Sequence, residues 1–264
     1  MNPQKPFSFK DSLSLRVHLP STTYRALKRK RSVELLCVKT DRQTDTIFYV
    51  AEAETSKRKE RQIVRRPKGT FVVLEGSDGS GKTTQARVLC AALRREGYKI
   101  HSTAEPSRGT VGRLIRRRIL HGKKTRPEVE ALLFAADRFL HLESEILPAL
   151  AVGRIVVCDR YVYASFAYQG AQDVDSQWLQ EINQFAVKPD LALYLDVPAK
   201  TGMSRIKRKK SLLEKLALQE RVREEYLKLA ESGELTLVDA TQTIEKVGEN
   251  VLNLVMSKLR EFEG

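Results

Sequence analysis

One motif near residue 80 constrains the fold of this chain more than any other feature. Residues 76–83 read Gly-Ser-Asp-Gly-Ser-Gly-Lys-Thr, which matches the phosphate-loop pattern G-x-x-x-x-G-K-[ST] at every fixed position. The apolar run Thr70–Leu74 before the motif reads as a buried strand, and Thr84–Arg95 after it reads as a helix. A glycine-rich turn without a ligand does not require this strand and helix. Pattern and context together therefore predict a binding site for a nucleoside triphosphate.

Each part of the loop has an expected role in holding phosphate. The glycines let successive backbone N–H groups surround phosphate oxygens, and the helix N-terminus adds partial positive charge. Lys82 can reach the β- and γ-phosphates, and the Thr83 hydroxyl can hold Mg²⁺. The residues expected to bind the nucleotide are Gly76, Ser77, Asp78, Gly79, Ser80, Gly81, Lys82, Thr83 and Thr84.

Length and composition limit the class of protein. The 264 residues are enough for one large domain, or for one domain and a small one. No stretch approaches 18 apolar residues, so no membrane-spanning helix is expected, and Met1–Lys10 lacks the apolar centre of a secretory signal. The three cysteines, Cys37, Cys90 and Cys158, lie far apart, which favours a reducing, cytoplasmic location without a disulfide framework.

The net charge of +14 is concentrated in the first quarter of the chain. Residues 1–69 hold 17 Lys and Arg against 7 Asp and Glu, whereas the remaining 195 residues hold 30 against 26. The charged, proline-containing run Thr55–Lys68 reads as a linker. We therefore expect a small basic N-terminal extension of unknown role over residues 1–69 and a catalytic domain over residues 70–264.

Within the extension, the sequence predicts a few short elements. Ser12–Leu19, Glu34–Lys39 and Thr46–Ala53 read as strands, and Ser21–Arg31 reads as a short helix. The polar residues 40–45 would form the turn between the last two strands.

From Thr70 onward, predicted strands and helices alternate. The expected strands are Thr70–Leu74, Tyr98–Thr103, Arg154–Cys158, Leu191–Leu195 and Leu235–Val238. The expected helices are Thr84–Arg95, Val111–Leu120, Pro127–Leu150, Asp175–Phe185 and Ile244–Phe262. This alternation predicts an α/β fold of the phosphate-loop type, a doubly wound five-stranded parallel sheet with helices on both faces. Ligands bind such sheets at the carboxyl ends of the strands.

An acid and an arginine follow the predicted strand Arg154–Cys158. Asp159 at the end of a strand near a phosphate loop can organise Mg²⁺ through water. Arg160 would point at the same phosphates and neutralise charge in the transition state. The residues alone are equally consistent with a structural Asp–Arg pair.

Three further groups of residues have both a functional and a plain interpretation. Phe134 and Arg138 lie at i and i+4 on one helix face and could hold a base, although a core Phe beside a surface Arg is the commoner case. Arg108, in a predicted turn, could clamp a second phosphate or simply be solvated. The basic run 205–210 is either a solvated face or a lid over the phosphates.

Taken together, these motifs resemble thymidylate kinases, a family of phosphate-loop nucleoside-monophosphate kinases, over about residues 70–262. The segments that carry the resemblance are Glu75–Gln85, Leu133–Arg138, Asp159–Tyr161, Ala167–Gly170, Tyr194–Pro198, Arg221–Leu229 and Val238–Ala240. The resemblance implies Mg²⁺-dependent transfer of the γ-phosphoryl of ATP to dTMP, giving dTDP and ADP. We also expect a homodimer that binds these small nucleotides.

The resemblance also implies roles in the acceptor site. Phe134 would stack on the thymine, and Arg138 would hold the base edge. Ser165 would lie in the base pocket. Tyr168 would flank the sugar and disfavour a 2′-hydroxyl, and Asp78 is expected near the sugar hydroxyl.

The resemblance also implies which cations lie near the phosphates. Arg108 and Arg160 would hold the acceptor phosphate region. Gly79 follows Asp78 where an arginine could stand, so a transition-state cation must come from elsewhere. The basic run after the fourth strand would supply it, from Arg205, Lys207 and Lys209. Together with Lys82, Asp159 and Arg160, we expect Arg205 and Lys209 to be catalytic.

A different class of protein also fits part of the sequence. A nucleic-acid-binding ATPase or regulator could use the loop as a switch and residues 1–69 as a basic arm. Such a protein has no need for a mononucleotide pocket, so Phe134, Arg138, Arg108 and Tyr168 favour the kinase. The extension could be a docking module or, in Met1–Lys39, an organelle-targeting leader. Acids and strand-like runs in residues 41–54 argue against a leader filling the whole extension.

Overall fold

The computed structural model of this chain describes residues 34–36, 49–51, 69–120, 125–206 and 215–263. The chain divides into two compact units, residues 1–64 and residues 65–264. Among the described residues, no helix is both long and apolar enough to cross a membrane.

The first unit contains one pair of short strands in its described part. β1 (Glu34–Leu36) and β2 (Tyr49–Ala51) pair antiparallel, with Leu35 opposite Val50. Both strands lie inside runs that the sequence predicts to be strands. The predicted strand Ser12–Leu19 and helix Ser21–Arg31 lie outside the described residues.

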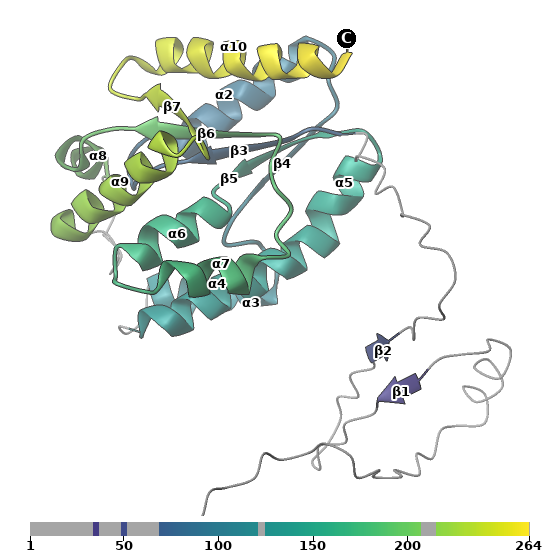
Figure 1. The fold of residues 1–264 in the computed structure, drawn as a ribbon. Helices are drawn as coiled ribbons and strands as arrows, with labels where there is room; N and C mark the ends of the chain where they lie inside the picture. The colour runs from purple at the N-terminus through teal and green to yellow at the C-terminus, as the bar shows by residue number, and fades with distance from the viewer. Residues whose placement is uncertain (1–33, 37–48, 52–68, 121–124, 207–214, 264) are drawn as a thin grey trace, which may run out of the picture. The chain divides into compact units, whose positions relative to one another are not determined.

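A five-stranded parallel sheet forms the centre of the second unit (Figure 1). Its strands are β3 (Phe71–Glu75), β4 (Ile100–Ala104), β5 (Ile155–Asp159), β6 (Leu191–Asp196) and β7 (Thr236–Asp239). They lie in the order β4-β5-β3-β6-β7, and every neighbouring pair is parallel. The phosphate-loop strand β3 is therefore central, and all five carboxyl ends lie at one edge of the sheet.

Helices cover both faces of the sheet, which confirms the doubly wound α/β fold. α2 (Lys82–Arg95) and α10 (Ile244–Glu263) pack on each other over one face (Figure 1). The other face is covered by α3 (Thr110–Ile115), η1 (Arg116–Leu120), α4 (Pro127–His141), η2 (Leu142–Ile146), α5 (Leu147–Ala151), α6 (Val162–Gly170), α7 (Ser176–Asn183) and α9 (Leu216–Glu231). The short helix α8 (Ala199–Arg205) follows β6.

Alternate residues of each strand point to opposite faces, so the sheet separates two apolar cores. On β3, Val72 and Leu74 face the core beneath α2 and α10. Phe71 and Val73 face the opposite core, where the Phe71 ring meets the edge of Tyr161 at a centroid distance of 5.0 Å. The continuous apolar run of β3 is thus explained by burial on both sides.

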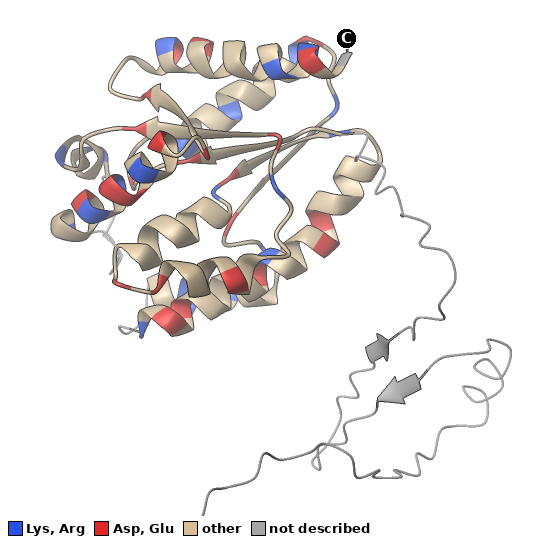
Figure 2. Ribbon diagram, viewed as in Figure 1, with Lys and Arg blue, Asp and Glu red and all other residues tan. Residues whose placement is uncertain are grey.

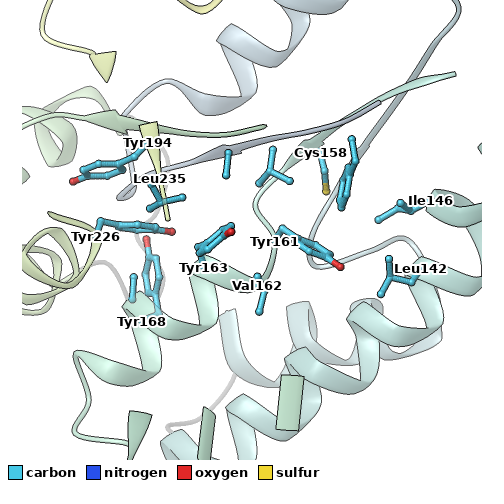
Figure 3. Packing of buried hydrophobic residues seen from close by; sticks show 14 of the residues in the cluster. Leu142, Ile146, Cys158, Tyr161, Val162, Tyr163, Tyr168, Tyr194, Tyr226 and Leu235 are labelled. Atoms are coloured by element: carbon cyan, nitrogen blue, oxygen red, sulfur yellow. The ribbon is translucent and has the colours of Figure 1, made fainter. Parts of the chain in front are cut away.

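The second core is rich in tyrosine (Figure 3). Tyr194 of β6 stacks on Tyr226 of α9 with ring centroids 4.9 Å apart. The Tyr194 hydroxyl donates to Asp196 and the Tyr226 hydroxyl donates to Glu75, each over 2.8 Å. Because buried tyrosine hydroxyls need partners, these two rings fix α9 against the carboxyl ends of β3 and β6.

The outward face of α9 carries charges of both signs (Figure 2). Lys228 pairs with Glu225 one turn away, and Arg221 pairs with Asp173. This mixture agrees with the small net charge that the sequence assigns to residues 70–264.

The sequence prediction missed three helices of the second unit, α6, α8 and α9. Two predicted helices are observed with an added π-helical turn. Val111–Leu120 is α3 followed by η1, and Pro127–Leu150 is the run α4, η2 and α5.

Candidate active site

A large cavity lies at the carboxyl ends of the strands, with a volume of about 1060 Å³. Five segments contribute most of its wall, namely the phosphate loop, the β4–α3 loop, the α4 and α6 helices and the β7–α10 loop. The lining residues include Asp78–Gln85, Ala104–Pro106, Arg116, Leu120, Phe134, Arg138, Asp159–Tyr161, Ala164, Ser165, Tyr168, Gln169, Arg205, Ile206, Ala240, Gln242–Ile244 and Val247. The cavity thus joins the phosphate loop to the predicted acceptor residues.

The phosphate loop has the backbone that anion binding requires. Gly76, Gly79 and Gly81 have φ angles of 151°, 80° and 96°, which residues with a side chain rarely adopt. Helix α2 begins at Lys82 without a side-chain cap and without an acid in its first turn. The Ser77 hydroxyl is buried and has no hydrogen-bond partner in the described part of the chain. A bound anion would satisfy the uncapped backbone N–H groups at the start of α2.

The loop is also pressed against α8. A Cβ atom on Gly79 would lie 1.9 Å from the carbonyl oxygen of Gly202, and a Cβ on Gly202 would lie 2.6 Å from the carbonyl oxygen of Asp78. The neighbours are backbone atoms that cannot rotate away. Both positions therefore need glycine.

Lys82 lies folded against its own loop. Its Nζ donates to the Ser77 carbonyl oxygen over 2.7 Å and to Ser80 Oγ over 3.3 Å. Burial, aided by the nearby Arg160 guanidinium, lowers the pKa of Lys82 to about 8. A phosphate beside Lys82 would favour its charged form, so the ammonium is placed to bind one.

Thr83 and Asp159 provide an oxygen pair at the mouth of the loop. The Thr83 hydroxyl donates to Asp159 Oδ2 over 2.5 Å. No cluster of three or more His, Cys, Asp or Glu ligands occurs within the described ranges. Mg²⁺ usually takes one or two protein oxygens together with phosphates and water, so this small donor set fits Mg²⁺.

Arg160 faces the phosphate loop, and its pair is not Asp159. Its backbone φ of 71° lies in the left-handed region. The guanidinium donates to Gly76 O over 3.0 Å, to Asp78 Oδ1 over 2.5 Å and to the Tyr168 hydroxyl over 3.2 Å. A left-handed arginine is strained by about 1–3 kcal/mol, so the surrounding contacts must hold it in place. This geometry turns the cation toward the loop.

Gln219 of α9 completes the environment of Asp78, although no motif or spacing in the sequence indicates it. Its amide oxygen accepts from the Asp78 N–H over 2.9 Å, and its amide nitrogen donates to Asp78 Oδ2 over 3.3 Å. Gln219 is fully buried. Asp78 is therefore held from two sides, by Arg160 and by α9.

Arg138 is buried, which corrects the plain interpretation of a surface arginine. Only 1% of its side chain is exposed. It donates to Glu105 Oε2 over 3.0 Å and to Asn183 Oδ1 over 2.5 Å. It also donates to the Tyr161 carbonyl and to Ser165 Oγ over 3.2 and 3.1 Å. A buried guanidinium needs such partners, and they fix its position in the cavity wall.

Several predicted acceptor residues meet in the same wall. Phe134 is half-buried and lines the cavity one helical turn from Arg138. Ser165 and Tyr168 line it from α6. Burial raises the pKa of the Tyr168 hydroxyl, so this group remains a neutral hydrogen-bonding partner of Arg160.

The cavity wall contains Arg116, which the sequence did not single out, and does not contain the predicted Arg108. Arg108 is exposed and does not line the cavity, whereas Arg116 of η1 does. Arg116 donates to the carbonyl oxygens of Ser107 and Pro106. The sequence shows Arg116 only as one of several arginines in a basic helix, so no signal distinguished it.

Gln169 was also missed within its recognised segment. It is buried in the cavity wall, and neither its amide oxygen nor its amide nitrogen has a hydrogen-bond partner among the residues the structure describes. Unpartnered buried amides are uncommon, which makes Gln169 a further candidate residue of this wall.

At the far side of the loop, Arg205 lines the cavity and donates to the Ala240 carbonyl over 3.2 Å. The predicted cations Lys207 and Lys209 lie outside the described residues.

A phosphate loop and the side chains of Phe134, Arg138, Ser165 and Tyr168 share one cavity on a five-stranded parallel sheet. That combination defines a phosphate-loop nucleoside-monophosphate kinase. The comparisons specify the family. A family model described as Thymidylate kinase matches residues 74–251, and the chain belongs to the thymidylate kinase family.

Curated relatives agree with the family model. The probable thymidylate kinase of Pyrococcus horikoshii is 47% identical over 201 residues, which are 73% of this chain and 98% of the relative. That of Thermococcus gammatolerans is 44% identical over 72% of this chain and 98% of the relative. The thymidylate kinase of Thermomicrobium roseum is 42% identical over 69% of this chain and 91% of the relative.

Proposed function

We propose that this chain transfers the γ-phosphoryl of ATP to dTMP, giving ADP and dTDP. The observation that carries this proposal is the single cavity in which the phosphate loop and the Phe134–Arg138 wall face common space. Phosphoryl transfer needs little covalent chemistry from the protein, because positioning and charge stabilisation dominate. The residues below act in those two ways.

The donor end of the cavity is the loop and the N-terminus of α2. The backbone N–H groups of residues 76–84 would surround the β- and γ-phosphates, and Lys82 would turn from the Ser77 carbonyl to bind them. Thr83 and Asp159 would hold Mg²⁺, which supplies charge neutralisation when bound. Arg205 beside Ala240 would contact the nucleotide from the other side, with Lys209 as a further proposed cation.

The acceptor end is built from α4 and α6. Phe134 would stack on the base. Arg138, fixed by Glu105 and Asn183, would hold the base edge together with the unpartnered amide of Gln169. Ser165 would help shape this pocket as a partner of Arg138.

The sugar and acceptor phosphate would lie between the base pocket and the loop. Tyr168 would flank the sugar and disfavour a 2′-hydroxyl, and Asp78 would meet the sugar hydroxyl. Arg160 and Arg116 would hold the acceptor phosphate from the cavity wall, and Arg108 of the neighbouring loop would be a further contact to it. Arg160 can reach both the loop and the acceptor, which suits a group that stabilises charge during transfer.

A side-by-side turnover assay tests the proposal. ADP formation is measured for the full chain with ATP, Mg²⁺ and dTMP, dUMP, dCMP, dGMP or UMP, each with and without DNA. We expect dTMP to be the best acceptor, dUMP weaker and UMP poorer still. A better rate with dCMP, dGMP or UMP would contradict the substrate assignment. ATP hydrolysis that needs DNA and no monophosphate would instead support the nucleic-acid ATPase.

We propose in addition a homodimer formed through α4 and α5. Val129, Leu132, Leu140 and Leu147 are 43%, 50%, 51% and 38% exposed. They recur at helical spacing along one side of the run α4–η2–α5. The double substitution Leu132→Glu and Leu140→Glu should convert dimer to monomer in light scattering, whereas Phe185→Ser, at an exposed position on another element, should not. An unchanged mass in the double variant would remove this interface.

We further propose a cytoplasmic location, where the buried thiols of Cys90 and Cys158 would stay reduced. Nucleic acid remains a proposed partner of the basic residues 1–69 alone, and the DNA arms of the turnover assay address it.

A further inference from the structure

A buried hydrogen-bonded chain lies behind Arg138 and leads from the cavity wall to the edge strand β4. Its first link is Glu105, whose side chain is 3% exposed and whose Oε2 accepts from Arg138 Nε over 3.0 Å. Arg138 has five N–H groups, and four of them have partners in the described part of the chain. The remaining N–H, on Nη1, is the one left for a ligand. Its direction depends on the partners that hold the planar guanidinium, of which Glu105 contacts both Nε and Nη2, each over 3.0 Å.

His141 is the second link, three residues after Arg138 on α4. Its side chain is fully buried, with Nδ1 3.4 Å from Glu105 Oε1 and Nε2 2.6 Å from Thr103 Oγ1. Thr103 Oγ1 is also 3.0 Å from Glu145 Oε2. Glu145 in turn lies 3.7 Å from His141 Nε2 and 3.5 Å from His101 Nε2. His141 is therefore flanked by two carboxylates and one hydroxyl.

Counting protons shows what His141 must do. The Thr103 hydroxyl has one hydrogen, which it gives either to Glu145 or to His141 Nε2. If Thr103 donates to Glu145, Nε2 must donate to Thr103, and Nδ1 can satisfy the Glu105 carboxylate only as the N–H of an imidazolium. If Thr103 donates to Nε2, the neutral ring carries its hydrogen on Nδ1. Both arrangements that satisfy an ionised Glu105 through His141 place a hydrogen on Nδ1, which donates to Glu105.

We propose that His141 is a positioning residue for recognition of the acceptor base, acting through Glu105 and Arg138. By donating to Oε1, it keeps Oε2 of the same carboxylate against Arg138 Nε. The free N–H of Arg138 then stays aimed at the base edge. This inference rests on the proposed function, because it takes the acceptor to be a nucleoside monophosphate bound at Arg138. It gives His141 no contact with the reacting atoms.

Four variants of the full chain separate this role from a structural one. An Asn amide reaches about where Nδ1 lies, so His141→Asn keeps the donor to Glu105. A Gln amide reaches about where Nε2 lies, so His141→Gln keeps the Thr103 contact and loses the donor to Glu105. His141→Leu removes both. Thr103→Val removes the hydroxyl while leaving the Nδ1 contact in place.

We expect KM for dTMP to rise about tenfold in His141→Gln and His141→Leu, the cost of one hydrogen bond to a charged group. KM for dTMP should stay within about threefold of the parent chain in His141→Asn and Thr103→Val, and KM for ATP within about twofold in all four. Melting temperatures are recorded alongside. If His141→Leu does not fold, the Asn and Gln variants still carry the comparison.

Equal effects of Asn and Gln on KM for dTMP would overturn the inference, as would a matching rise in KM for ATP. A fall in melting temperature without any change in KM for dTMP would also overturn it, because it would show a purely structural histidine. The parent chain is assayed first against the panel of monophosphates. If another monophosphate proves to be the acceptor, the proposed substrate is wrong, and the same four variants are compared with that acceptor.

Discussion

At the scale of single residues, the environment of Lys82 explains why this lysine suits a phosphate site. Burial lowers its pKa to about 8, and in the described structure two loop oxygens hold its Nζ. Binding ATP adds negative charge beside it and favours the protonated form further. The residue is thus held close to the loop until a phosphate takes over.

Lys82→Ala should abolish most phosphoryl transfer while leaving the fold intact. One lost phosphate clamp costs on the order of 10²–10³ in rate or more. The measurement is kcat for dTMP phosphorylation at saturating ATP, with melting temperature as the control for folding. A variant that keeps nearly full kcat would contradict the catalytic role of Lys82.

Phe134→Ala should raise KM for dTMP far more than KM for ATP. A base stack on an aromatic ring is worth roughly 1–3 kcal/mol by analogy with single-strand binding, which corresponds to about tenfold or more in KM. Leu133→Ala on the same helix is the matched control, since Leu133 packs in the core and does not line the cavity. Equal rises in both KM values would support a packing role for Phe134.

The sequence indicated residue types in the site better than their surroundings. Phe134, Arg138, Ser165 and Tyr168 all reach the cavity wall. Arg138 is nevertheless buried and paired, because partners from three other elements surround it. Those partners are distant in sequence, so periodicity could not place them. Likewise, the fold was needed to show that Arg116 lines the cavity and that Arg108 does not.

At the scale of elements, hydrogen bonds link α9 to the phosphate loop and to the carboxyl ends of two strands, β6 and β3. Gln219 contacts Asp78, Arg223 pairs with Asp196 through two 2.8 Å bonds, and Tyr226 donates to Glu75. Side chains one turn apart thus reach the phosphate loop, β6 and β3 in turn. The position of α9 and the shape of the loop are therefore linked through these three contacts.

Glu75 should make the stability of this packing depend on pH. Burial raises the pKa of Glu75 to about 7 from an ordinary value near 4.5. The Arg160 charge and the hydrogen bonds that Glu75 accepts from Tyr226 and Tyr161 oppose this shift. The folded state therefore keeps a proton that the unfolded state loses. The stabilisation is fully present below about pH 4.5 and is lost as pH rises through about 7.

Substituting Glu75 by Gln should remove that pH dependence. The free energy of unfolding is measured by urea titration at pH 5, 6, 7 and 8 for the parent chain and for Glu75→Gln. We expect the parent to lose stability relative to the variant as pH rises, by at most about 1.4 kcal/mol per pH unit. Glu249→Gln, at an exposed surface pair, controls for loss of a carboxylate. Parallel pH curves for the parent and Glu75→Gln would refute the assignment.

The elements that were predicted from the sequence differ in burial pattern or length from those that were missed. All five strands and the helices α2, α7 and α10 were predicted within a few residues, since their apolar patterns or flanking turns are distinct. α6 packs against α4, α7 and α9, so its apolar residues face several neighbours and show no single stripe. α8 has only seven residues. α9 carries seven charged residues among its sixteen and buries few positions, chiefly Gln219, Val222 and Tyr226.

At the scale of the whole molecule, the family relationship covers one part of the chain. The family model begins at residue 74, and the Pyrococcus relative matches over 98% of its own length while covering 73% of this chain. We therefore expect the kinase fold to form without the first residues of this chain. The boundary predicted from the sequence, between residues 69 and 70, lies close to the start of β3.

A chain of residues 65–264 should retain kinase activity. The compact second unit starts at residue 65, and Gly69 N–H donates to the Leu150 carbonyl over 3.0 Å. The cut is therefore placed before Gly69. We expect kcat within about twofold of the full chain and a melting temperature within about 2–4 °C, a loss of about 1 kcal/mol or less.

Retention on immobilised DNA is measured for both chains at rising salt. If residues 1–69 bind nucleic acid, only the full chain should be retained, and its retention should fall steeply with salt because phosphate contacts release counterions. Inactive or insoluble residues 65–264 would show that the extension belongs to the kinase fold. DNA retention that survives the cut would remove the docking role.

The contact between Gly79 and Gly202 limits which segments of this chain can be exchanged with those of related kinases. Alanine is preferred over glycine inside a helix by about 1 kcal/mol, so the glycine within α8 is kept against local helix propensity. In a library of chimeras, α8 and the phosphate loop should be exchanged together, because each needs a glycine where the two backbones touch. Exchanging α8 alone for a segment with any side chain at position 202 would displace the loop, and no substitution at position 79 could compensate.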